Sequence, residues 1–171
     1  MKILFQGDSV TDAGRDRSQS SDMGFGYPKY ASAMLEDAFS DIDFAFVNLG
    51  ISGNRTEDLV ARMQSDFIEI QPDIVSVMIG INDVWHHYAF TGIYTSNEAF
   101  EQNYTTVLEE IKQKTAAKIM IIQPFLIDVP DKQQLKAELA EKQAIVKRLA
   151  DKYADVYLPM HDIFAADEAQ D

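Results

Sequence analysis

The stretch KILFQGDSVTD, residues 2–12, joins a short apolar run to an abrupt polar turn. The apolar residues 3–5 predict a buried strand, and Gly7-Asp8-Ser9 predicts that this strand ends in a sharp turn. In an open parallel sheet, ligands bind just beyond the carboxyl ends of the strands. Ser9 is therefore expected where chemistry is carried out. Taken alone, Asp8-Ser9 would be explained equally well as the cap of a following helix.

Apolar runs and helical patterns alternate along the rest of the chain, without a linker or an internal repeat. Four more strands are expected, at residues 43–49, 74–79, 118–123 and 156–158. The run at 74–79 is almost entirely apolar, which is typical of a central parallel strand covered on both faces. This alternation predicts a single α/β domain over residues 1–171, with three α/β/α layers and a five-stranded parallel sheet of order 2-1-3-4-5.

Local signals place the helices between these strands. Pro28 suits the first turn of the first helix, and Thr56 is expected to cap the second. Ser96 or Asn97, and then Asp131, are expected to cap two long helices. The apolar stripe of the first helix is expected to comprise Tyr30, Met34, Leu35 and Ala38.

Two segments give weaker signals. Residues 84–95 are expected to form a lid-like loop or a short helix, and residues 161–171 form a short acidic tail. The first of these segments is aromatic and offers faces on which a sugar can stack, although a buried aromatic cluster is the commoner explanation. Its aromatic residues are Trp85, Tyr88, Phe90 and Tyr94.

Composition limits the function classes. The 171 residues carry a net charge of −13, which argues against nucleic acid and anionic membranes as partners. The absence of cysteine excludes disulfides and thiolate chemistry. No signal peptide fits the start of the chain and no apolar run is long enough to span a bilayer, so a cytoplasmic location is expected. Neither a metal nor another cofactor is expected.

Polar residues at three strand ends are expected to converge. The first strand ends in Gly7-Asp8-Ser9, the second in residues 50–54 (GISGN), and the third in residues 80–83 (GIND). These ends would place a serine hydroxyl beside an unobstructed glycine N–H and an asparagine side-chain amide. Acyl transfer needs such donors, aimed at the oxygen that develops negative charge. Each motif alone is explained by a turn, but three at consecutive strand ends favour a site.

These blocks resemble those of the SGNH, or GDSL-type, serine hydrolases. The resemblance extends over nearly the whole chain and implies a flavodoxin-like fold. It implies that Ser9 is the nucleophile, and that the backbone N–H groups of Ser9 and Gly53 and the Asn82 side chain form the oxyanion hole. The runs GISGNR and GINDVW are most similar to the branch of acetyl-xylan esterases and related carbohydrate deacetylases.

The resemblance implies an esterase that removes short acyl groups, acetyl in particular, from a carbohydrate or another small alcohol. The implied partner is a small-molecule ester, such as an acetylated sugar, and a homo-oligomer is compatible with the sequence. A lysophospholipase- or thioesterase-like lipolytic enzyme is an alternative within the same family. A non-catalytic carbohydrate- or partner-binding domain on the same scaffold is the alternative outside catalysis.

One departure from the family pattern concerns the base. The family's last block, Asp-x-x-His, follows the fifth strand and supplies the base and the group that orients it, and a serine nucleophile needs that base at neutral pH. The chain has only His86, His87 and His161, and the residue three before His161 is Leu158. All three histidines are expected to be surface or packing residues. The catalytic Asp and His, and the last helix of the fold, are expected to lie beyond residue 171.

Other chemistries fit less well. Asp8, Asp12 and Asp83 are potential metal ligands, but their spacing resembles no ligand set. A phosphoacceptor domain would need a lysine after the fifth strand, where Leu158-Pro159 stands. A flavin phosphate would be repelled by the aspartates after the first strand.

Overall fold

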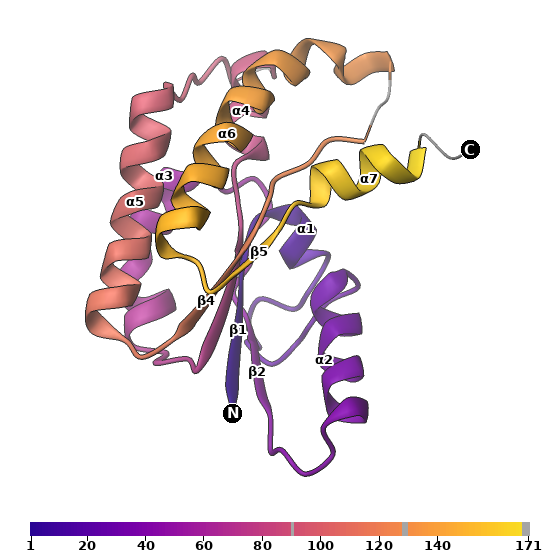
Figure 1. Ribbon diagram of the computed structural model, residues 1–171, viewed down its shortest axis with the longest axis vertical. Coiled ribbons are helices and arrows are strands. Elements are labelled where there is room, and N and C mark those ends of the chain that lie inside the picture. Colours follow the sequence, from indigo (N-terminus) through magenta and orange to yellow (C-terminus); the bar gives the residue numbers. More distant parts are fainter. Residues whose placement is uncertain (90, 128–129, 169–171) are drawn as a thin grey trace.

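The computed structural model describes residues 1–89, 91–127 and 130–168, and its centre is a parallel sheet of five strands (Figure 1). The strand order is β2-β1-β3-β4-β5, which confirms the α/β fold and the topology predicted from the sequence. The strands are β1 (Lys2–Gly7), β2 (Ala45–Asn48), β3 (Ile74–Met78), β4 (Lys118–Ile122) and β5 (Val156–Leu158).

The neighbouring strands β1 and β3 position the site. In β3, Val75 and Val77 are fully buried, as expected for a strand covered on both faces. The pairing of β1 with β3 runs to Gly7 opposite Met78, so the two strands end at the same level. A Cβ atom on Gly7 would lie 2.3 Å from the Met78 carbonyl oxygen and 2.4 Å from Thr11 Oγ1. Only glycine therefore allows this close approach at the end of β1.

Helices cover the two faces of the sheet unequally (Figure 1). One face carries α3, α5 and α6, and the other carries α2 and α7. The helices are α1 (Ser9–Asp12), α2 (Tyr27–Ala38), α3 (Thr56–Ala61), α4 (Ile81–Tyr88), α5 (Asn97–Lys114), α6 (Lys136–Tyr153) and α7 (Met160–Glu168). A π-helical turn, η1 (Gln64–Ile68), follows α3, and a 3-10 helix, η2 (Pro130–Leu135), precedes α6.

The main core lies between the sheet and the α3, α5 and α6 layer. The periodic apolar positions of the two long helices are buried there, as their spacing predicts. Its fully buried members include Phe67, Phe100, Leu108, Ile111, Ile121 and Val146. None of the helices within the described residues is both long and apolar enough to cross a membrane.

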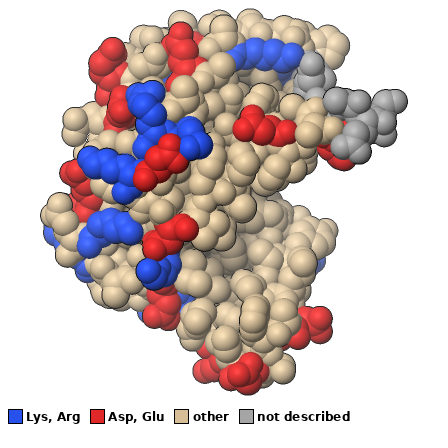
Figure 2. Space-filling model, in the orientation of Figure 1, with Lys and Arg blue, Asp and Glu red and all other residues tan. Residues whose placement is uncertain are grey.

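The opposite face of the sheet carries an apolar trough of about 660 Å³ beside α2. Figure 2 shows this flank as a hollow with few charged residues, between the regions of α2 and α7. The predicted apolar stripe of α2 is wrong for three of its four members, because Tyr30 is 66% and Met34 is 72% exposed and Ala38 is exposed too. Met34 lines the open trough and therefore remains in contact with solvent. The trough is lined by Ile3, Phe5, Met34, Leu35, Phe44, Met120, Ile122 and Leu158, among others.

Several local predictions need correction. Thr56 is the first residue of α3 and not its cap, because Arg55 occupies the cap position and the Thr56 hydroxyl bonds to Asp83. Asp131 lies in η2 and forms an ion pair with Lys132, so it does not cap α6. Of the two alternatives for residues 84–95, the short helix is found, as α4, but it begins earlier, at Ile81; the acidic tail contains helix α7. The prediction for Ser96 is confirmed, since its side chain accepts a hydrogen bond from the Ala99 N–H at 3.1 Å.

Candidate active site

The first block places Ser9 at the start of a single helical turn directly after β1. The Asp8 carboxylate accepts a hydrogen bond from the Val10 N–H at 3.1 Å and caps this turn. Asp8 therefore caps a helical turn, and the same turn presents Ser9 at the carboxyl edge of the sheet. The two interpretations of Asp8-Ser9, a helix cap and a site residue, are thus compatible. Ser9 is exposed, whereas Asp8 is buried. The Ser9 hydroxyl forms no hydrogen bond with another described side chain and is available to a substrate.

The second block brings Gly53 to the same edge. The Ile51 N–H donates to the Gly7 carbonyl oxygen at 3.1 Å, which ties the start of this loop to the end of β1. A Cβ atom on Gly50 would lie 2.7 Å from the Asp12 nitrogen, so the loop packs directly on α1. Gly53 has φ of +86° and no atom lies within 4 Å of the position of a Cβ atom. The backbone at Gly53 is therefore open on that side.

The third block places Asn82 in the first turn of α4, after a Gly80 with φ of +130°. The Asn82 side-chain amide donates to the Asn54 carbonyl oxygen at 3.1 Å. This bond holds the amide against the loop that carries Gly53 and leaves its second N–H free to bind another acceptor. The structure thus brings the three predicted residues, Ser9, Gly53 and Asn82, to one edge of the sheet.

Buried carboxylates give the site an unusual electrostatic environment. The pKa of Asp8 is raised to about 6, mainly by burial. A hydrogen bond from the Val10 N–H lowers this pKa in part, and the nearby charge of Asp83 adds to the increase. Burial likewise raises the pKa of Asp83 to about 6, against hydrogen bonds from Thr56. Burial also acts to raise the pKa of Asp12, but hydrogen bonds from Arg17 and Ser52 outweigh it, and the pKa is lowered. Within the described residues, no group of three or more acidic or histidine side chains is arranged to hold a metal ion.

Sequence reasoning treated Asp12 and Asp83 only as potential metal ligands and missed their structural partners. Asp12 accepts hydrogen bonds from both the N–H and the hydroxyl of Ser52, each at 2.8 Å. Asp83 accepts hydrogen bonds from the hydroxyl of Thr56 at 2.7 Å and from its N–H at 3.1 Å. A signal was present in the sequence, because Asp12 lies about one helical turn after Ser9 and Asp83 directly follows Asn82.

None of the three histidines is hydrogen-bonded to Ser9. His87 pairs with Glu138 at 2.9 Å and contacts the rings of Tyr88 and Tyr94. The Nδ1 atom of His86 is buried without a hydrogen-bond partner among the described residues.

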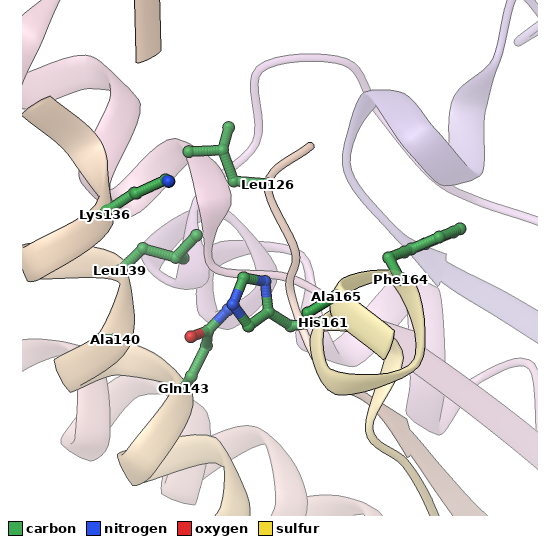
Figure 3. Close-up of a pocket in the computed structure, with 8 residues that line it drawn as sticks. All are labelled: Leu126, Lys136, Leu139, Ala140, Gln143, His161, Phe164 and Ala165. Carbon is green, nitrogen blue, oxygen red and sulfur yellow. The ribbon is translucent and has the colours of Figure 1, made fainter. Parts of the chain in front are cut away.

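His161 lines a cavity of about 300 Å³ between α6 and α7 (Figure 3). Its ring lies beside Gln143 in that view, and Leu126 and Phe164 also line the cavity. Residues of the three blocks do not line this cavity. The described histidines thus occupy packing or surface positions, as expected from the sequence.

The aromatic segment is partly exposed. Lys132 lies over the Trp85 ring at 4.1 Å from its centroid. Tyr88 is 45% and Tyr94 is 57% exposed, so neither belongs to a buried cluster. Phe90 lies outside the described residues.

The chain is similar to known proteins over nearly its whole length. The family model described as the GDSL-like lipase/acylhydrolase family matches residues 5–171. An acetylxylan esterase from Geobacillus stearothermophilus is 31% identical over 170 residues, which cover 95% of this chain and 77% of that protein.

Solved structures are similar to this chain over nearly its whole length. The crystal structure of that esterase matches with a TM-score of 0.87 at 31% identity, over 95% of this chain and 77% of that one. A protein described as GDSL-like lipase, from Parabacteroides merdae, matches with a TM-score of 0.89 at 29% identity, over 96% of this chain and 79% of that one. Structures of the Geobacillus esterase include catalytic mutants in which a serine, an aspartate or a histidine is replaced by alanine.

Proposed function

The chain belongs to the GDSL-like lipase/acylhydrolase family, and on this premise we propose that it hydrolyses acetyl and other short-chain esters of a carbohydrate or another small alcohol. Membership of the family makes it a carboxylic ester hydrolase, as the sequence predicts. An acetylated xylan or xylo-oligosaccharide is the substrate class suggested by the relative named acetylxylan esterase. The observation that carries the proposal is the meeting of Ser9, Gly53 and Asn82 at one edge of the sheet.

In the proposed mechanism the Ser9 hydroxyl attacks the ester carbonyl carbon while a histidine takes its proton. The carbonyl oxygen becomes negatively charged and accepts hydrogen bonds from the N–H groups of Ser9 and Gly53 and from the free N–H of Asn82. Collapse of this intermediate expels the alcohol, which receives the proton from the histidine. Water then attacks the acyl-enzyme by the same route, releasing the carboxylic acid and restoring Ser9.

The base and its orienting acid are proposed to come from an Asp-x-x-His sequence outside residues 1–171. Two observations support this. None of the described histidines is hydrogen-bonded to Ser9, and His87 and His161 are engaged elsewhere. In the Geobacillus esterase, the aspartate and the histidine replaced in the catalytic mutants lie three positions apart.

The experiment that tests the function uses the protein made from its full coding sequence. Hydrolysis of p-nitrophenyl acetate and of acetylated xylo-oligosaccharides is measured beside a Ser9→Ala variant. We expect release of acetate from both substrates by the unmodified protein and a loss of about 10⁴-fold or more in kcat for the variant. Equal rates for the two proteins would exclude Ser9 as the nucleophile. Activity on p-nitrophenyl acetate alone would exclude the carbohydrate ester.

A further inference from the structure

The turn that carries Gly53 is held from two sides by buried carboxylates. Asp12 of α1 binds Ser52, the residue before Gly53. Asp83 of α4 binds Thr56, three residues after it. We propose that Asp83 is a positioning residue, which sets the distance between the Gly53 N–H and the Asn82 amide in the oxyanion hole; this role rests on the proposed esterase function.

Hydrogen bonds of opposite direction link two adjacent residues of α4 to the segment from Asn54 to Thr56. Asn82 donates to the Asn54 carbonyl oxygen at 3.1 Å. Asp83, the next residue, accepts from the Thr56 hydroxyl at 2.7 Å and from its N–H at 3.1 Å. Since Asn54 directly follows Gly53, these bonds fix α4 and the Gly53 turn relative to each other. Asn82 alone would leave that placement to a single hydrogen bond.

Thr56 is itself held in place, so Asp83 is bound to a fixed partner. The side-chain amide of Asn103, on α5, lies 3.4 Å from the Thr56 hydroxyl oxygen and donates to it. The Thr56 hydroxyl can then give its own proton only to an acceptor, which is the Asp83 carboxylate. The chain Asn103–Thr56–Asp83 thus connects the start of α4 to the main core.

Burying the Asp83 carboxylate destabilises the folded protein, so a carboxylate at this position needs an explanation. Its side chain is fully buried and forms no ion pair with a described residue. Burial raises its pKa, and Arg55 and Lys142 lower that pKa only through their more distant charges. A buried carboxylate without a paired cation destabilises a fold unless its hydrogen bonds compensate. A role in holding the oxyanion donors accounts for a carboxylate at a place where an apolar side chain would cost less.

A double-mutant cycle distinguishes positioning from a general structural role. Asp83→Asn keeps the size of the side chain and one acceptor oxygen, but replaces the other carboxylate oxygen by an NH₂ group that cannot accept from Thr56. We expect it to lower kcat about 10- to 100-fold with little change in KM, because the donors act mainly in the transition state. In the Asn82→Ala background the same change should cost no more than about threefold, because the donor that it positions is absent.

Control variants address folding. Asp58→Asn removes a carboxylate from the same helix start, where Asp58 accepts from the Arg55 N–H and makes no hydrogen bond to α4; it should leave kcat within about twofold of the unmodified protein. Should Asp83→Asn fail to fold, Thr56→Val and Thr56→Ser replace it in the cycle. Only the valine variant lacks the hydroxyl donor, so only that variant should lose kcat.

The outcomes separate the two levels of the proposal. A Ser9-dependent rate, with the same loss from Asp83→Asn in both backgrounds, would overturn the positioning role and leave the esterase function intact. A rate that does not depend on Ser9 would overturn the function and this role with it. A large loss in the unmodified background and a small one in the Asn82→Ala background is the result that the structure predicts.

Discussion

The side-chain amide of Asn82 donates a hydrogen bond to the main-chain oxygen of Asn54 at 3.1 Å, which joins the third block to the second. Since Asn54 directly follows Gly53, this contact links the two donors of the proposed oxyanion hole, and the bonds of Asp83 to Thr56 add to it. It also explains why a residue at the start of a helix is largely buried, with 9% of Asn82 exposed.

Replacing Asn82 by alanine should lower kcat for an acetyl ester by about 10²–10³-fold, because one donor to the oxyanion is lost. The fold should persist, since alanine is a smaller residue that suits a helix and only one hydrogen bond, to Asn54, disappears. Steady-state kinetics and circular dichroism on the full-length protein check both parts. An Asn82→Ala variant with near-normal kcat would remove Asn82 from the mechanism.

Two glycines of the site should respond very differently to alanine. Gly7→Ala should cost roughly 3 kcal/mol or more of folding free energy, because its Cβ atom would meet the Met78 carbonyl oxygen at 2.3 Å. Gly53→Ala should cost only about 1–2 kcal/mol, for its positive φ, because no atom obstructs the new side chain. Urea unfolding of the two variants measures both values. A larger loss for Gly53→Ala than for Gly7→Ala would contradict the placement of these turns.

The sequence predicted the fold better than it predicted the hydrogen bonds that support the site. The apolar runs of β1 and β3 and the polar tips after them determine the sheet order and the edge where Ser9, Gly53 and Asn82 meet. The role of Thr56 was mistaken, because a threonine before an apolar helix pattern is the usual signal for a cap. Its hydroxyl bonds instead to Asp83, 27 residues away, and local patterns do not report such a contact.

The apolar stripe of α2 is a second case in which a local sequence pattern did not predict the tertiary contacts. The spacing of Tyr30, Met34 and Leu35 correctly predicts a helix with an apolar face. Periodicity cannot report how much of that face its neighbours cover, and Tyr30 and Met34 remain exposed.

Ionisation of Asp83 should make stability depend on pH. Its pKa is about 6 in the folded protein and near 3.8 when unfolded, so the folded state holds the proton more tightly between these values. The free energy of unfolding should therefore fall as the pH rises from about 4 to about 6, and this contribution should then level off. Urea unfolding of the unmodified protein and of Asp83→Asn measures the contribution of Asp83, including the effect of its charge on the pKa of Asp8. Between about pH 4 and about pH 6, the free energy of unfolding should fall more for the unmodified protein than for Asp83→Asn. A difference between the two proteins that stays constant over this range would contradict the raised pKa.

Short acyl chains should be preferred to long ones. The apolar trough beside α2 is lined by none of Ser9, Gly53 and Asn82, so it offers no continuous path for a long chain from the proposed nucleophile. We expect kcat/KM for p-nitrophenyl acetate to exceed that for the octanoate by roughly tenfold or more. A series of p-nitrophenyl esters from two to twelve carbons checks this. A maximum at long chains would favour a lipolytic enzyme.

The three histidines of the described chain should be dispensable for catalysis. His87 is paired with Glu138 and His161 lines a separate cavity. Alanine at each of His86, His87 and His161 in turn should keep kcat within about threefold of the unmodified full-length protein, whereas loss of a triad histidine costs roughly 10⁴–10⁶-fold. Initial rates on p-nitrophenyl acetate decide this. A collapse of kcat in one of the three variants would identify that histidine as the base.

The role of Ser9 as the nucleophile is tested most directly by finding where a serine-directed fluorophosphonate reacts. The reagent is added to the full-length protein, residual hydrolysis of p-nitrophenyl acetate is followed, and the modified peptide is identified by mass spectrometry. We expect one adduct per chain, on Ser9, formed in proportion to the loss of activity and absent from Ser9→Ala. Full activity with Ser9 modified, or inactivation with the adduct on another residue, would contradict this role.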